Sequence, residues 1–293
     1  MLYVPILGFI AFISLSVPFI YYTIKHGLKQ GLLLAGVALL GSLLILPLPL
    51  GLITVMAGSV GLVMGSFYRQ QGSPFYPVLA GSLTYLANFV LVVMFGYFAL
   101  NINAFDLFRE GLESQLALAD IDRLVSPAVG NGDEWLESTI QNITLLLPGW
   151  LMLISGVTAF FNHFLIRLLS KVTDLEIQPL APLWGWNLPK AILYYYLVVL
   201  LLLLFNLVQA DSTWYMPVLN IHFVLEILLL IQGFSLVAYL LHKKGVSRKM
   251  NGLLLTLLAG LLVVPFVASL VRIAGIIDLG FNLKEQLNHA LRS

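Results

Sequence analysis

A few polar side chains lie inside the long apolar stretches of this sequence, where they could form a binding site. His222 and Glu226 are four residues apart, so on a helix both side chains project from one face. Polar groups are costly in apolar surroundings, so they mark either a ligand or ion site or an internal polar network. Both alternatives are open, and we expect any site to comprise His222, Glu226, Asn88 and Arg272.

Arg272 is the best long-range partner for Glu226 in the sequence. The two apolar stretches that carry them follow each other and would run antiparallel, which places the residues at depths about two helical turns apart. A direct ion pair is therefore an open question. His163 and Arg167 are also four apart, but Arg167 is expected to extend its charge toward the membrane interface.

Recognisable catalytic and cofactor motifs are absent from the sequence. There is no H-E-x-x-H, G-x-S-x-G, P-loop or G-x-G-x-x-G pattern. His222 and Glu226 offer two ligands where a catalytic zinc ordinarily has three protein ligands. We therefore expect no enzyme activity, no metal and no cofactor, and transport would need a separate energising module.

The elements that must position these side chains are membrane-spanning helices. The chain is 60% hydrophobic and 10% charged with a mean hydropathy of +0.96, whereas soluble domains are about 25% charged. Apolar runs of about 18 residues or more predict helices that cross a bilayer, because only there are their backbone groups bonded internally. The sequence thus predicts an all-α, polytopic bundle of about eight spans in one domain, residues 1–293. The predicted spans are residues 3–23, 31–48, 50–68, 75–100, 143–169, 188–208, 218–241 and 252–271.

Charge and cysteine content exclude other classes of protein. A net charge of +1 without a basic stripe argues against nucleic acid as a partner. The absence of cysteine excludes disulfides and thiolate metal sites. Residues 1–23 lack the basic start of a cleavable signal. Either they form a first helix with its N-terminus outside, or a preceding helix is missing.

The distribution of Lys and Arg predicts an orientation in the bacterial cell membrane. Ten of the fifteen lie in one set of loops, which the positive-inside rule places in the cytoplasm. Lys25 and the loop at 243–249 are therefore expected in the cytoplasm. The connection 101–142 is expected to be extracellular, and Lys284 is expected on that outer side.

Two connections have a composition that suggests a role. Residues 101–142 predict an amphipathic helix, either a lid on the outer surface or a solvated spacer, with a turn at 129–133. Residues 174–189 combine prolines with Trp184 and Trp186, which predicts interfacial anchors or a docking surface for a cytoplasmic partner. The apolar residues at helical spacing in the outer connection are Phe105, Phe108, Leu112, Leu116 and Ala119.

Small residues recur every fourth position in two predicted helices. Ala57, Gly61 and Gly65 form one such row, and Gly31 and Ala35 belong to another. This spacing lets helix backbones approach closely in lipid. The rows predict either packing inside the bundle or the docking of a separate membrane subunit.

Several short motifs resemble the YybS-like family of uncharacterised bacterial integral membrane proteins, which is distantly similar to the S components of energy-coupling-factor (ECF) transporters. The resemblance extends over nearly the whole chain, although each motif alone has low specificity, and position 284 is Lys where the family pattern suggests Arg. The motifs are Leu2 to Gly8, Leu147-Pro148-Gly149 with Asn162 and Arg167, Pro179 to Pro182, Trp186 to Pro189, Gln232 to Ser235, Gly275 to Asp278, and Phe281 to Lys284.

The resemblance implies a function without identifying a ligand. It favours a small-molecule binding or transport subunit that depends on a separate energising or partner module in the bilayer. The alternative is a scaffold or regulator of a membrane-bound signalling enzyme. A cyclic-dinucleotide phosphodiesterase is the candidate partner, because genes of this family commonly neighbour one.

Overall fold

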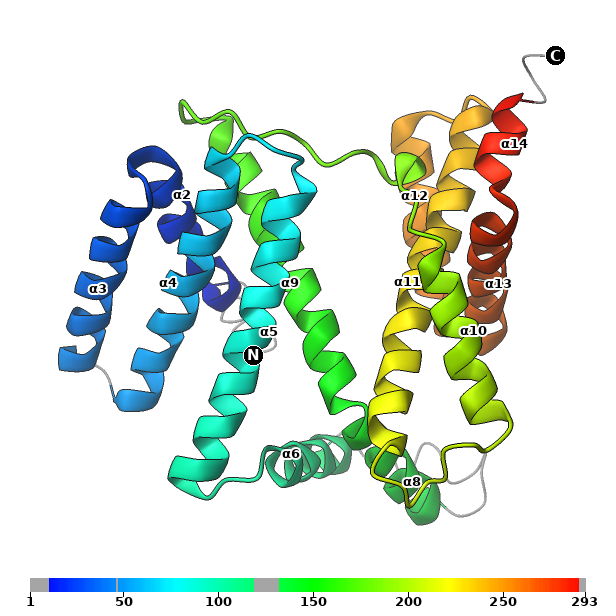
Figure 1. The fold of residues 1–293 in the computed structure, drawn as a ribbon, viewed down its shortest axis with the longest axis horizontal. Coiled ribbons are helices and arrows are strands. Elements are labelled where there is room, and N and C mark those ends of the chain that lie inside the picture. The colour runs from blue at the N-terminus through cyan, green and yellow to red at the C-terminus, as the bar shows by residue number, and fades with distance from the viewer. Residues whose placement is uncertain (1–10, 46, 119–131, 290–293) are drawn as a thin grey trace. The chain divides into compact units, whose positions relative to one another are not determined.

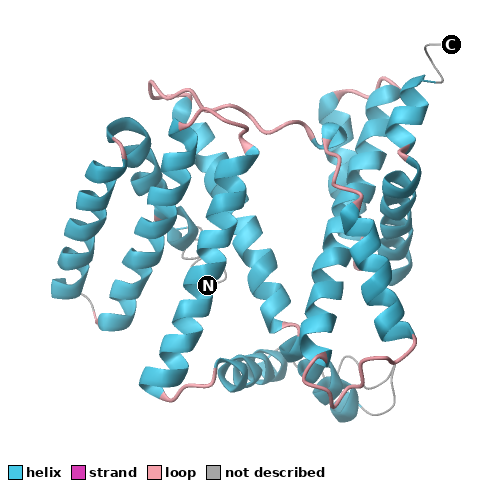
Figure 2. Ribbon diagram, viewed as in Figure 1, coloured by secondary structure: helices cyan, strands magenta, loops and turns pink. Residues whose placement is uncertain are grey.

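The computed structural model describes residues 11–45, 47–118 and 132–289, and in these ranges it consists of helices joined by loops, without a strand (Figure 2). The predicted all-α fold is therefore confirmed. The motif at residues 2–8, Ala119 and most of the predicted turn at 129–133 lie outside the described residues.

Apolar helices of spanning length account for much of the chain. Within the described residues, five helices are long and apolar enough to cross a membrane, and each coincides closely with a predicted span. The predicted span 188–208 contains a shorter apolar helix, Ala191–Leu204. The five are Leu28–Ile45, Gly51–Arg69, Phe75–Leu100, Leu147–Ser170 and Tyr215–Lys243.

The chain divides into two compact units, Met1–Leu180 and Ala181–Ser293. In the N-terminal unit, α4 packs against α2, α3 and α5, and α9 packs against α5 (Figure 1). Its core includes Ile20, Val60 and Met64, which are fully buried. Its helices are α2 (Ser16–His26), α3 (Leu28–Ile45), α4 (Leu48–Arg69), α5 (Phe75–Leu100), α6 (Ala104–Leu118), α8 (Gly132–Leu145) and α9 (Leu147–Ser170).

The rows of small residues lie at helix contacts inside this unit. A Cβ atom on Gly61 would lie 2.2 Å from the Cβ of Phe19, and one on Gly65 would lie 2.6 Å from the Cβ of Thr23. Gly31 also faces Thr23, Ala35 lies opposite Gly58, and Ala57 is buried. Helix α2 thus occupies the face that Gly61 and Gly65 form on α4.

The described part of the connection at residues 101–142 contains two helices, where the sequence predicted one. α6 lies across the end of α5 (Figure 1) and contacts α8. Arg109 on α6 pairs with Glu113 at 2.8 Å and with Glu137 of α8 at 3.5 Å. Only the pair with Glu137 joins the two helices, and because these side chains are half-exposed or exposed, both pairs add little stability.

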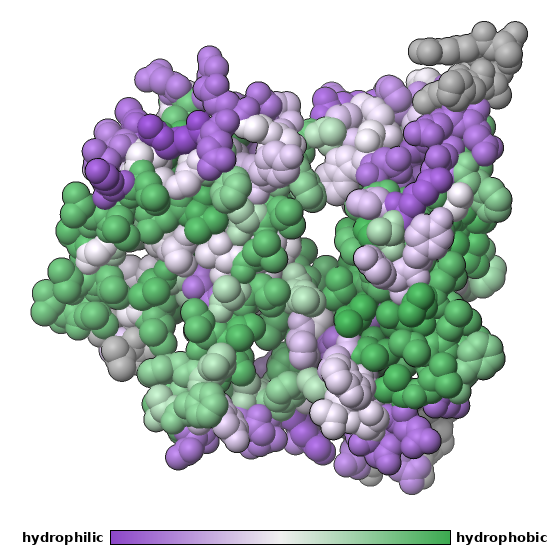
Figure 3. All heavy atoms as spheres, viewed as in Figure 1, coloured by the Kyte–Doolittle hydropathy of each residue, from purple (hydrophilic) through white to green (hydrophobic). Residues whose placement is uncertain are grey.

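The C-terminal unit is built on α11 (Tyr215–Lys243), which packs against η1, α10, α12 and α13 and hydrogen-bonds through its side chains to α14. Apolar side chains cover the middle of this unit and polar side chains its two ends (Figure 3). Its elements are a 3₁₀ turn η1 (Leu183–Gly185), α10 (Ala191–Leu204), α11 (Tyr215–Lys243), α12 (Arg248–Leu261), α13 (Pro265–Phe281) and α14 (Leu283–His289).

The predicted span 252–271 is wrong, because the structure breaks it into α12 and α13. Val264 has an extended backbone and Pro265 opens the next helix. Proline lacks the N–H that a continuing helix needs and disfavours a helical residue before it. Helix α12 has 14 residues, about 21 Å, which is shorter than the hydrocarbon core of a bilayer.

The break reverses the direction that the sequence predicted for the end of the chain. Glu226 pairs with Arg272 and Gln232 with Asp278, and each pair is 46 positions apart. A constant separation means that α13 runs parallel to α11. The predicted position of Lys284, on the side opposite to the loop at 243–249, is therefore also wrong: Lys243 Nζ donates to the carbonyl of Leu287 at 2.5 Å.

Candidate functional site

His222, Glu226 and Arg272 come together on α11 and α13. Because the two helices are parallel, Arg272 lies at the level of Glu226, and its guanidinium contacts the Glu226 carboxylate. His222 Nε2 is 4.0 Å from Glu226 Oε1. The side chains of Glu226 and Arg272 are 26% and 27% exposed, so the pair is accessible from the surface of this unit.

The imidazole of His222 is held by stacking. The centre of its ring lies 5.4 Å from the centre of the Tyr196 ring on α10, and the angle between the two ring planes is 25°. Its Nε2 atom is buried and has no hydrogen-bond partner among the described residues. A buried polar atom without a partner is unusual, and it can be satisfied by a bound polar molecule.

Asn88, the fourth predicted site residue, belongs to the N-terminal unit. Its side-chain amide donates to Ser59 Oγ at 2.9 Å, which joins α5 to α4. The three other residues belong to the C-terminal unit. Asn88 therefore has a partner of its own within a different compact unit.

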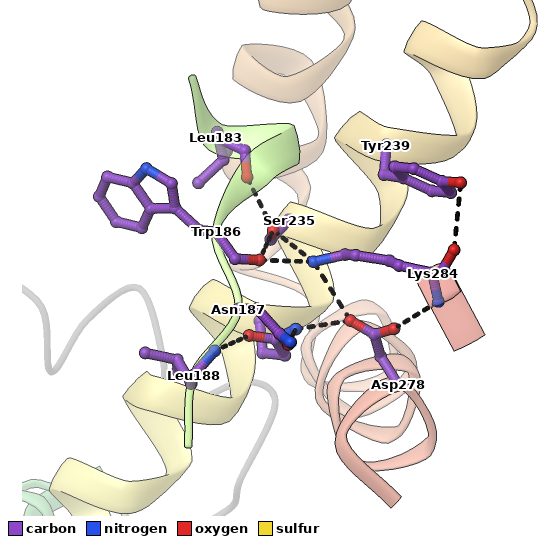
Figure 4. Close-up of polar contacts among 9 residues, drawn as sticks. Leu183, Trp186, Asn187, Leu188, Ser235, Tyr239, Asp278 and Lys284 are labelled. Atoms are coloured by element: carbon purple, nitrogen blue, oxygen red, sulfur yellow. Dashed lines mark hydrogen bonds and ion pairs between the residues drawn. The ribbon is translucent and has the colours of Figure 1, made fainter. Parts of the chain in front are cut away.

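A second polar cluster lies further along α11 and α13, and it is shown in Figure 4. Gln232 donates to Asp278 Oδ2 at 2.5 Å, and Lys284 Nζ lies 3.2 Å from the same oxygen. Lys284 Nζ also donates to Ser235 Oγ at 2.7 Å and to the carbonyl of Trp186 at 2.6 Å. Three segments far apart in the sequence, around Trp186, Ser235 and residues 278–284, therefore meet at one ammonium group.

The cluster fixes the Pro/Trp-rich connector to the helices. Ser235 Oγ lies 2.7 Å from the carbonyls of both Leu183 and Trp186. The backbone N–H of Leu188 donates to Gln232 Oε1 at 3.0 Å, and Gln232 donates to Asn187 Oδ1 at 3.3 Å. We call this set of residues the connector clamp: Asn187, Gln232, Ser235, Asp278 and Lys284.

The connector clamp is more suited to holding structure than to catalysis. Burial lowers the pKa of Lys284, while the neighbouring Asp278 carboxylate raises it and so opposes the shift. An ammonium group has three N–H donors, and Lys284 has three acceptors: Asp278, Ser235 and Trp186. Its three donors are thus all used, and an ammonium group has no lone pair that could accept a proton from Ser235.

The residues of the connector clamp lie in the motifs of the family resemblance, but no site is predicted for them from the sequence. Asp278 and Lys284 lie beyond residue 271, where the last predicted span ends. Trp186 and Lys284 are 98 positions apart. The only feature of the sequence that marks this site is the spacing of Asp278 and Lys284, six residues apart beside apolar sequence. That spacing does not indicate which distant residues they contact.

No group of three or more His, Asp and Glu side chains in the described ranges could hold a metal ion. The trio of His222, Glu226 and Arg272 contains a cation, which would repel a metal. The arrangement instead suits a polar organic ligand that both donates and accepts hydrogen bonds.

Comparison with known proteins identifies relatives of the whole chain. A family model described as "Predicted membrane protein (DUF2232)" matches residues 1–279. The chain is 25% identical to the "Uncharacterized protein YybS" of Bacillus subtilis (strain 168) over 291 residues, which covers 97% of this chain and 92% of that protein. No solved structure matches the chain.

Proposed function

We propose a binding function for this chain, which belongs to the DUF2232 family of predicted membrane proteins. It is a membrane-embedded subunit that binds a small polar molecule at His222, Glu226 and Arg272. A separate module supplies energy or receives the signal, as in the S components of ECF transporters.

One observation carries the proposal: on two apolar helices, a partly exposed ion pair lies beside a buried imidazole nitrogen that has no hydrogen-bond partner among the described residues. Charged side chains within spanning helices are costly and usually belong to a ligand or ion pathway. The opposite charges of Glu226 and Arg272 cancel, which favours a neutral or zwitterionic ligand. The lack of any nucleotide-binding motif in the sequence supports dependence on a second protein.

The test is a thermal-stability screen of the purified chain in detergent against a panel of vitamins and other small metabolites. We expect at least one compound to raise the melting temperature, because a ligand that binds only the folded state stabilises it. The shift should disappear in Glu226→Gln and in His222→Ala. It should persist in Asp211→Asn, a control that removes an exposed acid from the same unit.

Two outcomes would contradict this function. One is a panel in which no compound stabilises the protein. The other is a stabilising compound whose effect is the same in Glu226→Gln as in the unchanged chain.

The second candidate function is a scaffold or regulator of a membrane signalling enzyme, such as a cyclic-dinucleotide phosphodiesterase. It is favoured by an aromatic and basic surface at one end of the C-terminal unit. The Trp184 ring stacks on His242 at 4.5 Å, and the Arg248 guanidinium lies 6.0 Å from the centre of the Trp184 ring. Aromatic and Arg side chains of this kind are enriched at protein interfaces.

Affinity purification from native membranes in a mild detergent tests this alternative. A stoichiometric membrane enzyme should copurify with the chain and be lost from the Arg248→Glu variant. Recovery of the chain without such a partner would exclude the scaffold function.

A further inference from the structure

A cavity of about 200 Å³ lies at the end of α4 in the N-terminal unit. It is formed by the last turn of α4, the turn that follows, the start of α5 and the chain beyond α9 (Figure 1). This volume corresponds to several water molecules at about 30 Å³ each, so a small organic group fits. The lining side chains relevant to binding are Phe67, Tyr68, Gln71, Glu176 and Gln178.

The chain beyond α9 forms one wall of the cavity, because alternate side chains of residues 175–178 face the cavity. Leu175 and Ile177 pack against the hydrophobic core of the unit. Glu176 and Gln178 line the cavity. In extended chain, successive side chains point to opposite sides, so this pattern directs a carboxylate and an amide into the same space.

The electrostatics of the cavity favour a cation. Glu176 is an acid, and no Lys or Arg belongs to the cavity lining. The 22-residue helix α4 ends at the cavity, and the C-terminal end of a helix carries partial negative charge. Phe67 and Tyr68 add aromatic rings, whose faces attract cations.

The same groups favour an organic cation over a metal ion. Calcium takes about six to eight oxygen ligands and magnesium requires octahedral geometry, whereas this cavity offers one carboxylate and two side-chain amides. An organic ammonium group instead needs one counter-charge, ring faces, and carbonyl oxygens that stabilise its positive charge. Glu176, the two aromatic rings, and the side chains of Gln71 and Gln178 supply these three.

Tyr68 is held in position from behind the cavity wall. A hydrogen bond of 2.8 Å joins its hydroxyl to Nδ1 of His163 on α9. His163 is 3% exposed and therefore fixed within the helix bundle. Because the Tyr68 ring is already immobilised, it loses little further conformational entropy when a ligand binds.

We propose that this cavity binds an ammonium group, carried either by a small free amine or by the headgroup of an aminophospholipid. The site is independent of His222, Glu226 and Arg272, since it uses other residues in the other compact unit. The result of a binding test at this cavity therefore does not decide the function proposed for His222, Glu226 and Arg272.

The first test measures binding of choline to the full chain in detergent, with 3,3-dimethylbutan-1-ol as a probe of the same shape without the charge. We expect saturable binding of choline and not of the alcohol. Glu176→Gln should weaken choline binding by about tenfold, since a charge-assisted contact is lost. Asp174→Asn should leave it unchanged, because Asp174 is exposed and does not line the cavity. Absence of saturable choline binding, equal binding of the alcohol, or an unchanged affinity in Glu176→Gln would overturn the proposal.

A second measurement distinguishes the two sources of the ammonium group. Choline is titrated into the chain in nanodiscs of phosphatidylglycerol, and in nanodiscs that also contain phosphatidylethanolamine. A headgroup that occupies the cavity should compete and lower the apparent affinity for choline severalfold. Equal affinities in the two membranes identify a free amine as the ligand, whereas loss of choline binding in both would overturn the proposal.

Discussion

Glu226 and Arg272 carry opposite charges on helices whose neighbouring residues are almost all apolar. Bringing both charges together costs less than leaving either alone, since each compensates the other. The pair is nevertheless about one quarter exposed, so its strength lies between that of a buried and a surface ion pair.

Single and double substitutions at this pair should therefore have non-additive effects. Glu226→Gln and Arg272→Gln should each lower the free energy of unfolding by about 1–3 kcal/mol, because each leaves one charge unpaired. The double variant should lose less than the sum of the two, since no lone charge remains. Titration with sodium dodecyl sulfate measures unfolding of each variant.

Asp211→Asn serves as the control for this cycle, and its effect should lie within about 0.5 kcal/mol. If the double variant loses the full sum of the single losses, Glu226 and Arg272 do not interact. The close contact in the structure would then not contribute to stability.

At the scale of elements, helices with clear ends in the sequence are predicted well. The span 75–100 matches α5 residue for residue, because Pro74 precedes it and Asn101 ends it in a left-handed conformation (φ 53°). Residues 261–264 are also apolar, so hydropathy alone continues through the break between α12 and α13. Pro265 was the available signal, and it could equally have marked a kink in one helix.

The candidate site could be predicted only in part from the sequence, because one of its contacts depends on the break at Pro265. His222 and Glu226 are four residues apart on one helix, and this proximity can be read from the sequence. The contact of Glu226 with Arg272 depends on the direction of α13, which depends on the break. Apart from the Asp278–Lys284 pair, the connector clamp depends on contacts between residues 44 to 98 positions apart, and helical spacing carries no information about these.

The reversal at Pro265 has a consequence that cysteine labelling can test. The chain has no cysteine, so a single introduced cysteine is the sole target of a membrane-impermeant thiol reagent. Ser247→Cys, before α12, and Gln286→Cys, in α14, should react from the same side of the membrane. Ser212→Cys, before α11, should react from the opposite side, because α11 is long enough to cross the bilayer.

The reference in this experiment is the chain without cysteine, which should not react from either side. Labelling of Gln286→Cys from the side of Ser212→Cys would contradict the reversal. It would favour a last helix that crosses the membrane, as the hydropathy of residues 252–271 suggested.

At the scale of the whole molecule, each compact unit has its own close helix contact. In the N-terminal unit, a Cβ atom on Gly61 would lie 3.0 Å from the backbone nitrogen of Ile20 on α2. In the C-terminal unit, a Cβ atom on Gly275 would lie 2.1 Å from the carbonyl oxygen of Leu229 on α11. A larger side chain at either glycine must push two helix backbones apart. Such overpacking lowers the free energy of unfolding by about 1–3 kcal/mol.

Because the two units have separate cores, the effects of these substitutions should remain local. Gly61→Leu should raise hydrogen–deuterium exchange in peptides from Met1–Leu180, and Gly275→Leu should raise it in peptides from Ala181–Ser293. Gly252→Leu is the control, since no atom lies within 4 Å of the added Cβ. Mass spectrometry of the exchanged chain in detergent resolves the two regions. Equal increases in both regions for either substitution would mean that the chain unfolds as one cooperative domain, and its two cores would then not be independent.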